Sequence, residues 1–534
     1  MPHDTGRYPV AIHPRLAEGW RLERLTAVSH LFGANGMRVG PDGRIHIAQV
    51  SGNQISALDI DTGLVEAVSP LGGDIVAPDD LAFDADGNLY ATEVMDARVS
   101  VRRPDGSTHV LRDDLPSANG ITIHQGRLFI DECRIGGRLM ELSLDGAAPR
   151  VLLEDIPMPN ALEMGPDGML YFPVMGANEI WRINPDGGVA ERVVGDLGVP
   201  DAVKFDSKGF IVSTQVASGE VLRIDPRTGA KERLAALDPG LDNLVFVGER
   251  LFVSDFTGRV TELLGAGNSR AVLPGGFNAP FGLALAKDGD LYIADGPFMY
   301  RLTPGGEPRG VGMLFTPGYP GYVRGLTNAA DGNGFVVTTS GGAVALYRPA
   351  DRYSEVLADG FDQLYGVVAA PGEVVIAADL GAGRVVAIRA GETEELAGGL
   401  LRPIDVAVTA DGDVLVAESG AGRVVKIVRG KAETLVDGLQ RPHGILIRGD
   451  HLYIVDVGAK TVIEYALASG TQRVIAADLA VGAPPGVVPK PLRGIPPLSG
   501  PMGPFAGIAD GPDGTLYVSA DGEGSIIALR PPRG

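Results

Sequence analysis

The chain has 534 residues, more than one hydrophobic core uses, so at least two domains are expected. Its net charge of −21 argues against nucleic acid and anionic membrane surfaces as partners. The single cysteine, Cys133, excludes an intramolecular disulfide framework and any site built from several thiolates. No secretory signal and no apolar run near the roughly 20 residues of a membrane span is found, so we expect a cytoplasmic protein that acts on a small molecule.

A repeat of about 40 residues runs through most of the chain. Each copy has a small or polar residue, an alternating strand, a turn such as Pro-Asp-Gly, and a second strand that ends in an acid or an amide. A third and a fourth strand follow. In chain order, clear copies are GANGMRVGPDGRIHIAQV, APDDLAFDADGNLYATEV, MPNALEMGPDGMLYFPVM, VPDAVKFDSKGFIVSTQV, RPIDVAVTADGDVLVAES and FAGIADGPDGTLYVSAD. Four short antiparallel strands in such a period are typical of one β-propeller blade.

The residue that opens the first strand of each copy defines a set of twelve equivalent positions, called ring positions below. They are Asn35, Asp79, Asn119, Asn160, Asp201, Asp242, Phe281, Arg324, Tyr365, Ile404, His443 and Ala506. Because one propeller normally has about four to eight blades, the sequence predicts an all-β fold with two six-bladed propellers in tandem. We place the first in residues 1–265 and the second in residues 266–534, the latter interrupted by a Pro- and Gly-rich insert at 480–503.

The ends of the two predicted rings leave one strand each to assign. The twelfth copy stops after its third strand, and an unassigned strand, WRLERLTAV, precedes the first copy. We expect WRLERLTAV to complete the sixth blade and SRAVLP, near residue 270, to complete the twelfth, so that no strand edge stays unpaired. A contiguous arrangement without this exchange stays open.

In the first half the six ring positions hold three amides and three carboxylates, all of them oxygen ligands. The second half has the same turns but holds Phe, Arg, Tyr, Ile, His and Ala there, so the turn itself does not require Asn or Asp. Converging carboxylates repel one another unless a cation lies between them. An all-oxygen set favours Ca²⁺ over Mg²⁺ and Mn²⁺, and Zn²⁺ least of all.

A second polar series ends the second strand of most copies in both halves, for example Glu93, Glu132, Asp255, Asp379 and Glu418, and Arg98, Arg259, Arg384 and Arg423 follow four of them. Because both halves have it and Arg often follows, we interpret it as a series of structural ion pairs, with Glu93 and Glu132 kept as secondary catalytic candidates.

The first half resembles the calcium-dependent six-bladed propeller hydrolases of the gluconolactonase, senescence-marker-protein and luciferin-regenerating family, with the paraoxonases as relatives. The resemblance is carried by Asn119 in SANG, Asn160 in PNAL and Asp201 in VPDAVKFD, and by Asp242 in LDNLVF. It implies a metal site of Asn119, Asn160, Asp201, Asn35 and Asp242, with Asp201 as the base. In one departure from the family pattern, the neutral Asn35 stands where the family has Glu, and Asp79 or Asp242 could restore the charge.

The second half resembles NHL-type repeats in GRVVKIVRG after LVAESGA, and RPHGI around His443 resembles propeller lyases such as virginiamycin B lyase. Its predicted channel offers His443, Arg324 and Tyr365, although a hydrogen-bonded filler is the simpler interpretation of a lone channel His. The insert is rigid and apolar enough to cover this channel or to form an interface.

Together these features favour a divalent-metal-dependent hydrolase of a small lactone or ester, acting in the channel of the first propeller. Asp79 and Asp242 compete with Asp201 as the base, because a carboxylate that ligates a metal is a weak one. The alternatives are an isomerase or lyase that uses the same metal site, and a non-catalytic double propeller that binds ligands or partners. The sequence indicates neither the substrate nor the oligomeric state.

Overall fold

The computed structural model describes residues 6–532, which form strands, turns and three short 3₁₀ helices, η1 (Met175–Ala177), η2 (Pro349–Asp351) and η3 (Pro512–Gly514). The chain is therefore all-β over its described part, as predicted. Contacts divide it into two compact units. The first unit is His30–Gly276 with Val488–Pro496, and the second is the described part of Met1–Ser29, Phe277–Val487 and Pro497–Gly534. In residues 6–532 no helix has the length and apolar character needed to cross a membrane.

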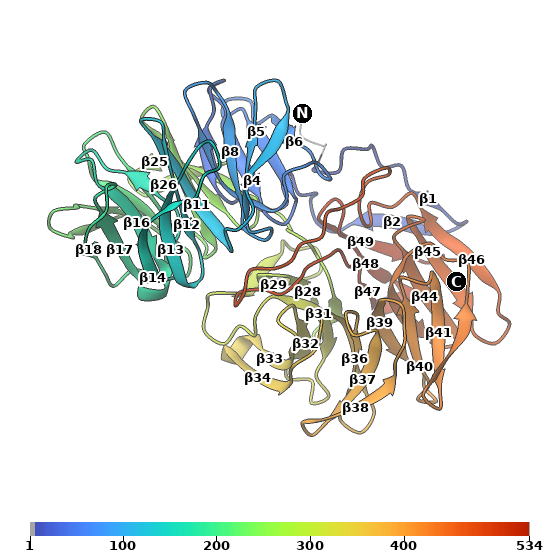
Figure 1. The fold of residues 1–534 in the computed structure, drawn as a ribbon. Helices are drawn as coiled ribbons and strands as arrows, with labels where there is room; N and C mark the ends of the chain where they lie inside the picture. The colour runs from blue at the N-terminus through green and yellow to red at the C-terminus, as the bar shows by residue number, and fades with distance from the viewer. Residues whose placement is uncertain (1–5, 533–534) are drawn as a thin grey trace. The chain divides into compact units, whose positions relative to one another are not determined.

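The first unit consists of four-stranded antiparallel sheets whose strands follow one another in chain order (Figure 1). These sheets are β3 (Met37–Val39), β4 (Ile45–Gln49), β5 (Gln54–Leu58) and β6 (Val65–Ser69); β7 (Pro78–Phe83), β8 (Leu89–Glu93), β9 (Arg98–Arg102) and β10 (Thr108–Arg112); β11 (Ala118–His124), β12 (Arg127–Glu132), β13 (Ile135–Leu142) and β14 (Arg150–Pro157); β15 (Glu163–Met164), β16 (Leu170–Val174), β17 (Glu179–Ile183) and β18 (Glu191–Val194); β19 (Pro200–Phe205), β20 (Ile211–Gln215), β21 (Glu220–Ile224) and β22 (Lys231–Ala236); and β23 (Leu241–Val247), β24 (Arg250–Asp255), β25 (Val260–Gly265) and β26 (Asn268–Leu273).

The second unit repeats this plan, with two strands from the N-terminal part of the chain added to its last two sheets. These sheets are β27 (Leu283–Leu285), β28 (Leu291–Asp295), β29 (Phe298–Leu302) and β30 (Arg309–Met313); β31 (Val323–Asn328), β32 (Phe335–Thr339), β33 (Val344–Arg348) and β34 (Tyr353–Ala358); β35 (Leu364–Ala370), β36 (Val374–Asp379), β37 (Arg384–Arg389) and β38 (Glu392–Ala397); β39 (Pro403–Val408), β40 (Val414–Glu418), β41 (Arg423–Val428) and β42 (Lys431–Val436); β43 (Pro442–Arg448), β44 (His451–Asp456), β45 (Thr461–Ala466) and β46 (Gln472–Ala477) with β1 (Arg15–Leu16); and β47 (Ile508–Asp510), β48 (Leu516–Ala520) and β49 (Ser525–Arg530) with β2 (Arg21–Arg24).

In each unit the first strands of successive sheets lie side by side. In the first unit β3, β7, β11, β15, β19 and β23 follow one another, and β23 contacts β3 again. In the second unit β27, β31, β35, β39, β43 and β47 do the same, and β47 contacts β27. Apolar side chains fill the space between sheets, including the closing pair: Met37 of β3 and Phe252 of β24 share one buried cluster. Each unit is therefore a closed series of sheets around its own first strands.

The hairpin between first and second strands shows why the repeat has an Asp-Gly turn. Gly43 has φ +79°, a conformation that a residue with a Cβ adopts only with strain. The carboxylate of Asp42, just before it, accepts a hydrogen bond from the backbone N–H of Arg44 at 3.1 Å. Asp167 holds the corresponding turn in the same way, accepting from the backbone N–H of Met169 at 3.1 Å.

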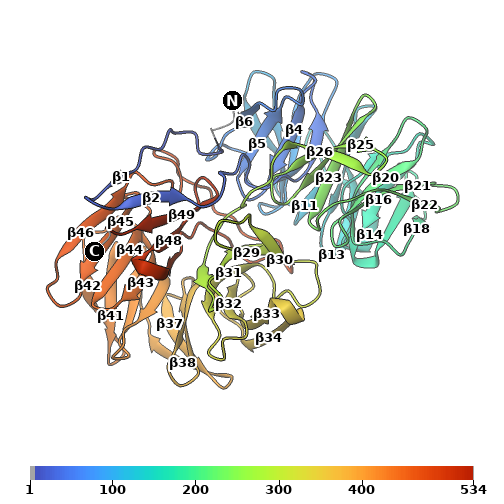
Figure 2. The same ribbon diagram turned by 180° about the vertical axis from the view of Figure 1, so that it is seen from behind.

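The expected exchange of closing strands is wrong. Residues 268–273, which contain SRAVL, pair with β25 of their own sheet, because the short turn before Asn268 brings them back onto it directly. The N-terminal strand β2 pairs instead with β49, the last strand of the second unit, as Figures 1 and 2 show with a blue strand beside a red one. Arg21 lies opposite Arg530 and Arg24 opposite Ile527. The twelfth sheet thus gains its fourth strand from the other end of the chain.

Candidate functional site

The six ring positions of the first unit lie at, or just before, the start of its first strands. Asn119, Asn160, Asp201 and Asp242 are buried, and Asp79 is partly exposed, as is Asn35. The side chains therefore lie where the first strands begin, and four of them have left bulk water almost entirely.

Buried hydroxyl groups fix the backbone of this ring. Thr92 Oγ1 accepts a hydrogen bond from the backbone N–H of Asp80 at 3.0 Å and donates one to the carbonyl of Asn119 in the next sheet. The same pair of contacts is made by Thr214 with Ala202 and Asp242, and by Ser254 with Asn243 and Asn35. Each hydroxyl joins the inner strands of two neighbouring sheets, so the spacing of the ring residues is set by buried hydrogen bonds.

The three ring carboxylates destabilise one another's charge. Burial and the neighbouring carboxylate of Asp80 raise the pKa of Asp79 to about 7. Burial, then the charges of Asp79, Asp80 and other carboxylates, raise the pKa of Asp201 well above its usual value. The pKa of Asp242 is raised in the same way, by burial and then by Asp201 and Asp79. Among residues 6–532, no basic side chain forms an ion pair or a hydrogen bond with any of the three, so the ring is a cluster of carboxyl groups without a paired cation.

Two ring amides orient two of these carboxylates. Asn35 Nδ2 donates to Asp242 Oδ2 at 2.9 Å, and Asn160 Nδ2 donates to Asp201 Oδ2 at 3.2 Å. No side-chain hydrogen bond to Asp79 is found within residues 6–532. Asp79 is therefore the ring carboxylate whose oxygens are least engaged by the protein.

The donor set fits a hard cation only if amides take part. Among residues 6–532, no three side chains of His, Cys, Asp or Glu are grouped closely enough to hold one metal ion. The predicted set of Asn119, Asn160, Asp201, Asn35 and Asp242 adds amide oxygens, which Ca²⁺ accepts alongside carboxylates. In this structure Asn35 and Asn160 present their amide nitrogens to the carboxylates, so each amide would have to rotate to offer its oxygen.

A second layer of charged residues, which the sequence reasoning missed, lies three residues after the ring positions. Glu163 accepts hydrogen bonds from Lys204 Nζ at 2.7 Å and from Arg38 Nη1 at 3.1 Å. Arg38 also donates to the carbonyl of Ile121 at 2.8 Å and lies 3.7 Å from the carboxylate of Asp80. Reading every first strand at this offset would have found one Glu between two cations.

Asp131 occupies the position that a hydroxyl holds in neighbouring sheets. It is completely buried, and its Oδ1 accepts a hydrogen bond from the backbone N–H of Gly120 at 3.1 Å, as Thr92 does from Asp80. Its Oδ2 has no hydrogen-bond partner. Burial, followed by nearby carboxylates, raises the pKa of Asp131 well above its usual value. Asp131 therefore takes over the acceptor role of the threonine hydroxyl in this structure, but not its hydrogen bond to the next sheet.

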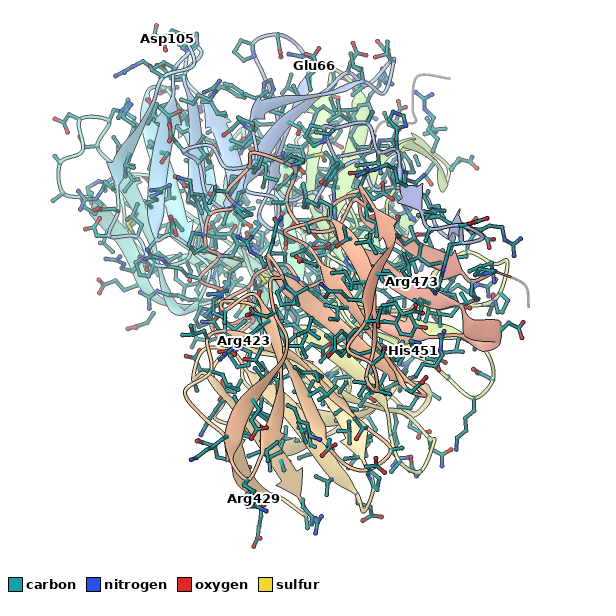
Figure 3. The ribbon with its side chains drawn as sticks, turned by 90° about the vertical axis from the view of Figure 1, so that its right-hand side faces the viewer. Glu66, Asp105, Arg423, Arg429, His451 and Arg473 are labelled. Atoms are coloured by element: carbon teal, nitrogen blue, oxygen red, sulfur yellow. The ribbon has the colours of Figure 1, made fainter. Side chains whose placement is uncertain are left out.

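The acids at the ends of the second strands act within their own sheets. Glu93 pairs with Arg98 at 2.6 Å, and Glu418 pairs with Arg423 at 2.6 Å, the latter labelled in Figure 3. Glu132 is completely buried and pairs with Arg134 at 2.8 Å. The predicted ion pairs of Glu93 and Glu418 are present, as is that of Asp379 with Arg384 at 3.0 Å. These ion pairs leave the two secondary catalytic candidates, Glu93 and Glu132, without a free carboxylate for catalysis.

One predicted ion pair of this series is absent. Asp255 accepts from the hydroxyl and the backbone N–H of Thr257, whereas the guanidinium of Arg259 pairs with Asp238 at 3.3 Å. The turn after the second strand satisfies the Asp255 carboxylate locally, which frees Arg259 to reach the neighbouring loop.

The predicted channel residues of the second unit are packed against the end of the insert. Arg324 is fully buried, lies 4.4 Å from the ring centre of Tyr365 and donates to the carbonyls of Leu364, at 3.0 Å, and Pro501. The hydroxyl of Tyr365 donates to the carbonyl of Gly503 at 3.3 Å.

His443 completes this packed group. Burial lowers the pKa of His443 to about 3, and its Nδ1 accepts a hydrogen bond from the backbone N–H of Ala506 at 3.3 Å. Its imidazole stacks on Phe505, with ring centres 6.2 Å apart. His443 is a neutral, hydrogen-bonded packing residue in this structure, which agrees with the simpler interpretation of a lone channel His.

Comparisons with known proteins give similarities of fold. No protein-family model matches the chain, and no curated protein matches it. A solved streptogramin B lyase is 19% identical with a TM-score of 0.39, over 52% of this chain and 96% of that one. A putative gluconolactonase is 19% identical with a TM-score of 0.38, over 48% and 95%. A gluconolactonase from Xanthomonas campestris is 17% identical with a TM-score of 0.38, over 47% and 93%. Such values carry no argument about activity.

Proposed function

We propose that each unit is a six-bladed β-propeller, and that the first is a divalent-metal-dependent hydrolase of a small lactone or ester. The closed series of six first strands in each unit supports the architecture. The observation that carries the function is the ring of three carboxylates, Asp79, Asp201 and Asp242, whose pKa values burial and neighbouring carboxylates raise and which pair with no basic side chain of residues 6–532. The substrate class rests on the resemblance of SANG, PNAL and VPDAVKFD to the lactone-hydrolysing family.

Calcium is the proposed cofactor because the ring offers only oxygen donors. Asn119, Asn160, Asp201, Asn35 and Asp242 would hold it, and the raised pKa values of the carboxylates would then fall. When bound, Ca²⁺ supplies a positive charge that polarises a substrate carbonyl and stabilises the negative charge that develops on its oxygen.

Asp79 is the proposed general base. Burial and the carboxylate of Asp80 raise its pKa in the metal-free ring. No side-chain hydrogen bond within residues 6–532 engages its oxygens, so they are available to take a proton from an attacking water. The carboxylates of Asp201 and Asp242 each accept a hydrogen bond from a ring amide, and both belong to the predicted ligand set. We therefore assign the proton transfer to Asp79 and the holding of the cation to Asp201 and Asp242.

The layer of Arg38, Glu163 and Lys204 supports the ring from three residues further along the first strands. Its ion pairs join three of the first strands, β3, β15 and β19, at this level. The buried hydroxyls of Thr92, Thr214 and Ser254 hold the spacing of the ring residues.

Hydrolysis of δ-valerolactone and phenyl acetate by the full chain, with Ca²⁺ present, tests this proposal. Asp79→Asn should lower kcat by at least about a hundredfold, as expected for removal of a general base. Asp105→Asn, an exposed turn residue in the same unit, is the matched control and should leave kcat unchanged. Full activity in Asp79→Asn would refute the role of Asp79, and no hydrolysis of either substrate by the wild type would contradict the assignment of a hydrolase.

A further inference from the structure

The second unit has an open cavity where the first has its layer of ion pairs. The cavity has a volume of about 290 Å³, near the lower end of the roughly 300–1,000 Å³ of small-molecule sites. The positions three residues after the ring residues all line it, and they are small or apolar: Ala284, Thr327, Val368, Ala407, Leu446 and Ala509. The corresponding positions of the first unit include Arg38, Glu163 and Lys204.

One carboxylate, Asp405, lies in the wall of this cavity and is 9% exposed. Its carboxylate accepts the same pattern of backbone hydrogen bonds as that of Asp80 in the first unit. Asp405 Oδ1 accepts from the backbone N–H of Val406 at 2.9 Å, and Oδ2 accepts from that of Ile445, in the next sheet, at 2.8 Å. Asp80 accepts from Leu81 at 2.8 Å and from Ile121, the equivalent residue of its next sheet, at 3.3 Å.

Asp80 and Asp405 differ in the cationic side chains that lie near them. Arg38 lies 3.7 Å from Asp80, and the charges of Arg38 and Lys204 both favour its ionised form. Among residues 6–532, no cationic side chain pairs with Asp405, whose pKa burial raises to about 7. The other acid that lines the cavity, Asp510, is already paired with Arg448, whose Nε donates to it at 2.7 Å. Within residues 6–532, Asp405 is thus a buried carboxylate without a paired cation beside an open cavity.

The geometry points to a second binding site, in which this cavity takes a small organic cation: a primary ammonium group on a short apolar body, its charge paired with Asp405. The ammonium would occupy the place that Arg38 and Lys204 take beside Asp80. Each oxygen of Asp405 accepts one backbone hydrogen bond and keeps a lone pair for an ammonium donor. The apolar body would be removed from water against side chains such as Val368 and Leu446. This site lies in the second unit and does not depend on the proposed chemistry of the first.

Ligand-observed NMR titration of the full chain with n-butylammonium, and with n-butanol as its neutral counterpart, tests this inference. The wild type should bind n-butylammonium saturably and at least tenfold more tightly than n-butanol. Asp405→Asn should weaken ammonium binding at least tenfold, because the amide has no negative charge. Ala407→Phe should also abolish binding, since it fills the cavity while Asp405 stays in place. Asp411→Asn, an exposed acid of the same sheet, is the control and should bind as the wild type does.

Each outcome decides the matter. Absence of saturable binding to the wild type would overturn the inference, as would equal affinity for n-butanol. Unchanged binding in Asp405→Asn or in Ala407→Phe, with circular dichroism showing a folded chain, would place the ligand elsewhere and also overturn it. If Asp405→Asn fails to fold, the comparison of n-butylammonium with n-butanol and the Ala407→Phe variant still decide.

Discussion

Asp80 in the first unit and Asp405 in the second hold the same position and accept equivalent backbone hydrogen bonds. Around Asp80 the channel contains Arg38 and Lys204, whereas around Asp405 it contains small apolar side chains and open space. At the ring positions the contrast is reversed, because the first unit concentrates carboxylates there and the second packs Arg324 against its insert. The same repeat can therefore carry different side chains along its first strands. The hydrogen bonds that shape the ring come largely from hydroxyl groups on the second strands, such as those of Thr92 and Thr214.

The largest expected effect concerns the ion-pair layer of the first unit. Glu163→Ala leaves the buried Lys204 and the half-buried Arg38 without their carboxylate, and we expect a loss of about 3 kcal/mol in the free energy of unfolding. Urea denaturation, followed at the unfolding transition of the first unit, measures this loss in free energy. The control is Glu191→Ala. Glu191 lies in β18 and is an exposed ion-pair partner of Arg182, so its loss should cost less than about 1 kcal/mol of unfolding free energy. Equal losses in the two variants would contradict the assigned role of the layer.

The second prediction contrasts pH dependence in the second unit. The folded-state pKa of Asp405, about 7, lies above the unfolded value near 3.9, so the folded state binds more protons between these values. Wild-type stability should therefore fall as pH rises from 5 to 8, whereas Asp405→Asn lacks this titration. Between pH 5 and pH 8, the unfolding free energy of the variant relative to the wild type should therefore rise by roughly 2 kcal/mol. Urea denaturation at both pH values measures it. A difference independent of pH would refute a raised pKa.

The third prediction concerns the hydroxyls that join neighbouring sheets. Thr92→Val keeps the shape but removes both hydrogen bonds, to Asp80 and to Asn119, and should cost about 1–3 kcal/mol. Thr393→Val, on an exposed strand position, is the control and should be nearly neutral. Thermal denaturation of both variants checks this. A neutral Thr92→Val would show that packing alone sets the ring spacing.

The smallest effect is expected where an acid takes the place of such a hydroxyl. Asp131→Thr restores the residue type of Thr92 and Thr214, and should change stability by less than about 1 kcal/mol. Asp131→Leu removes the acceptor for the Gly120 N–H and should cost about 1–3 kcal/mol. If Asp131→Thr is as damaging as Asp131→Leu in thermal denaturation, Asp131 does more than replace a hydroxyl.

The sequence predicted the strands and turns well, because Asp-Gly turns and alternating strands are local signals. It also predicted the ion pairs of Glu93, Glu418 and Asp379 from the spacing to the following Arg. The pairing of the N-terminal strand with β49 was missed, since it joins residues about 500 positions apart and several sheet edges fit the pattern equally. The Glu163 layer was missed because its members come from separate sheets and only the ring positions were compared.

Isothermal titration of the full chain with Ca²⁺ tests the central claim most directly, alongside an Asn160→Ala, Asp201→Ala double variant. The matched control carries Asn184→Ala and Asp105→Ala, the same residue types on exposed turns of the same unit. We expect one ion bound per chain in the wild type and the control, and none in the ring variant. Unchanged binding in the ring variant, or no binding to the wild type, would contradict a metal site in the first ring.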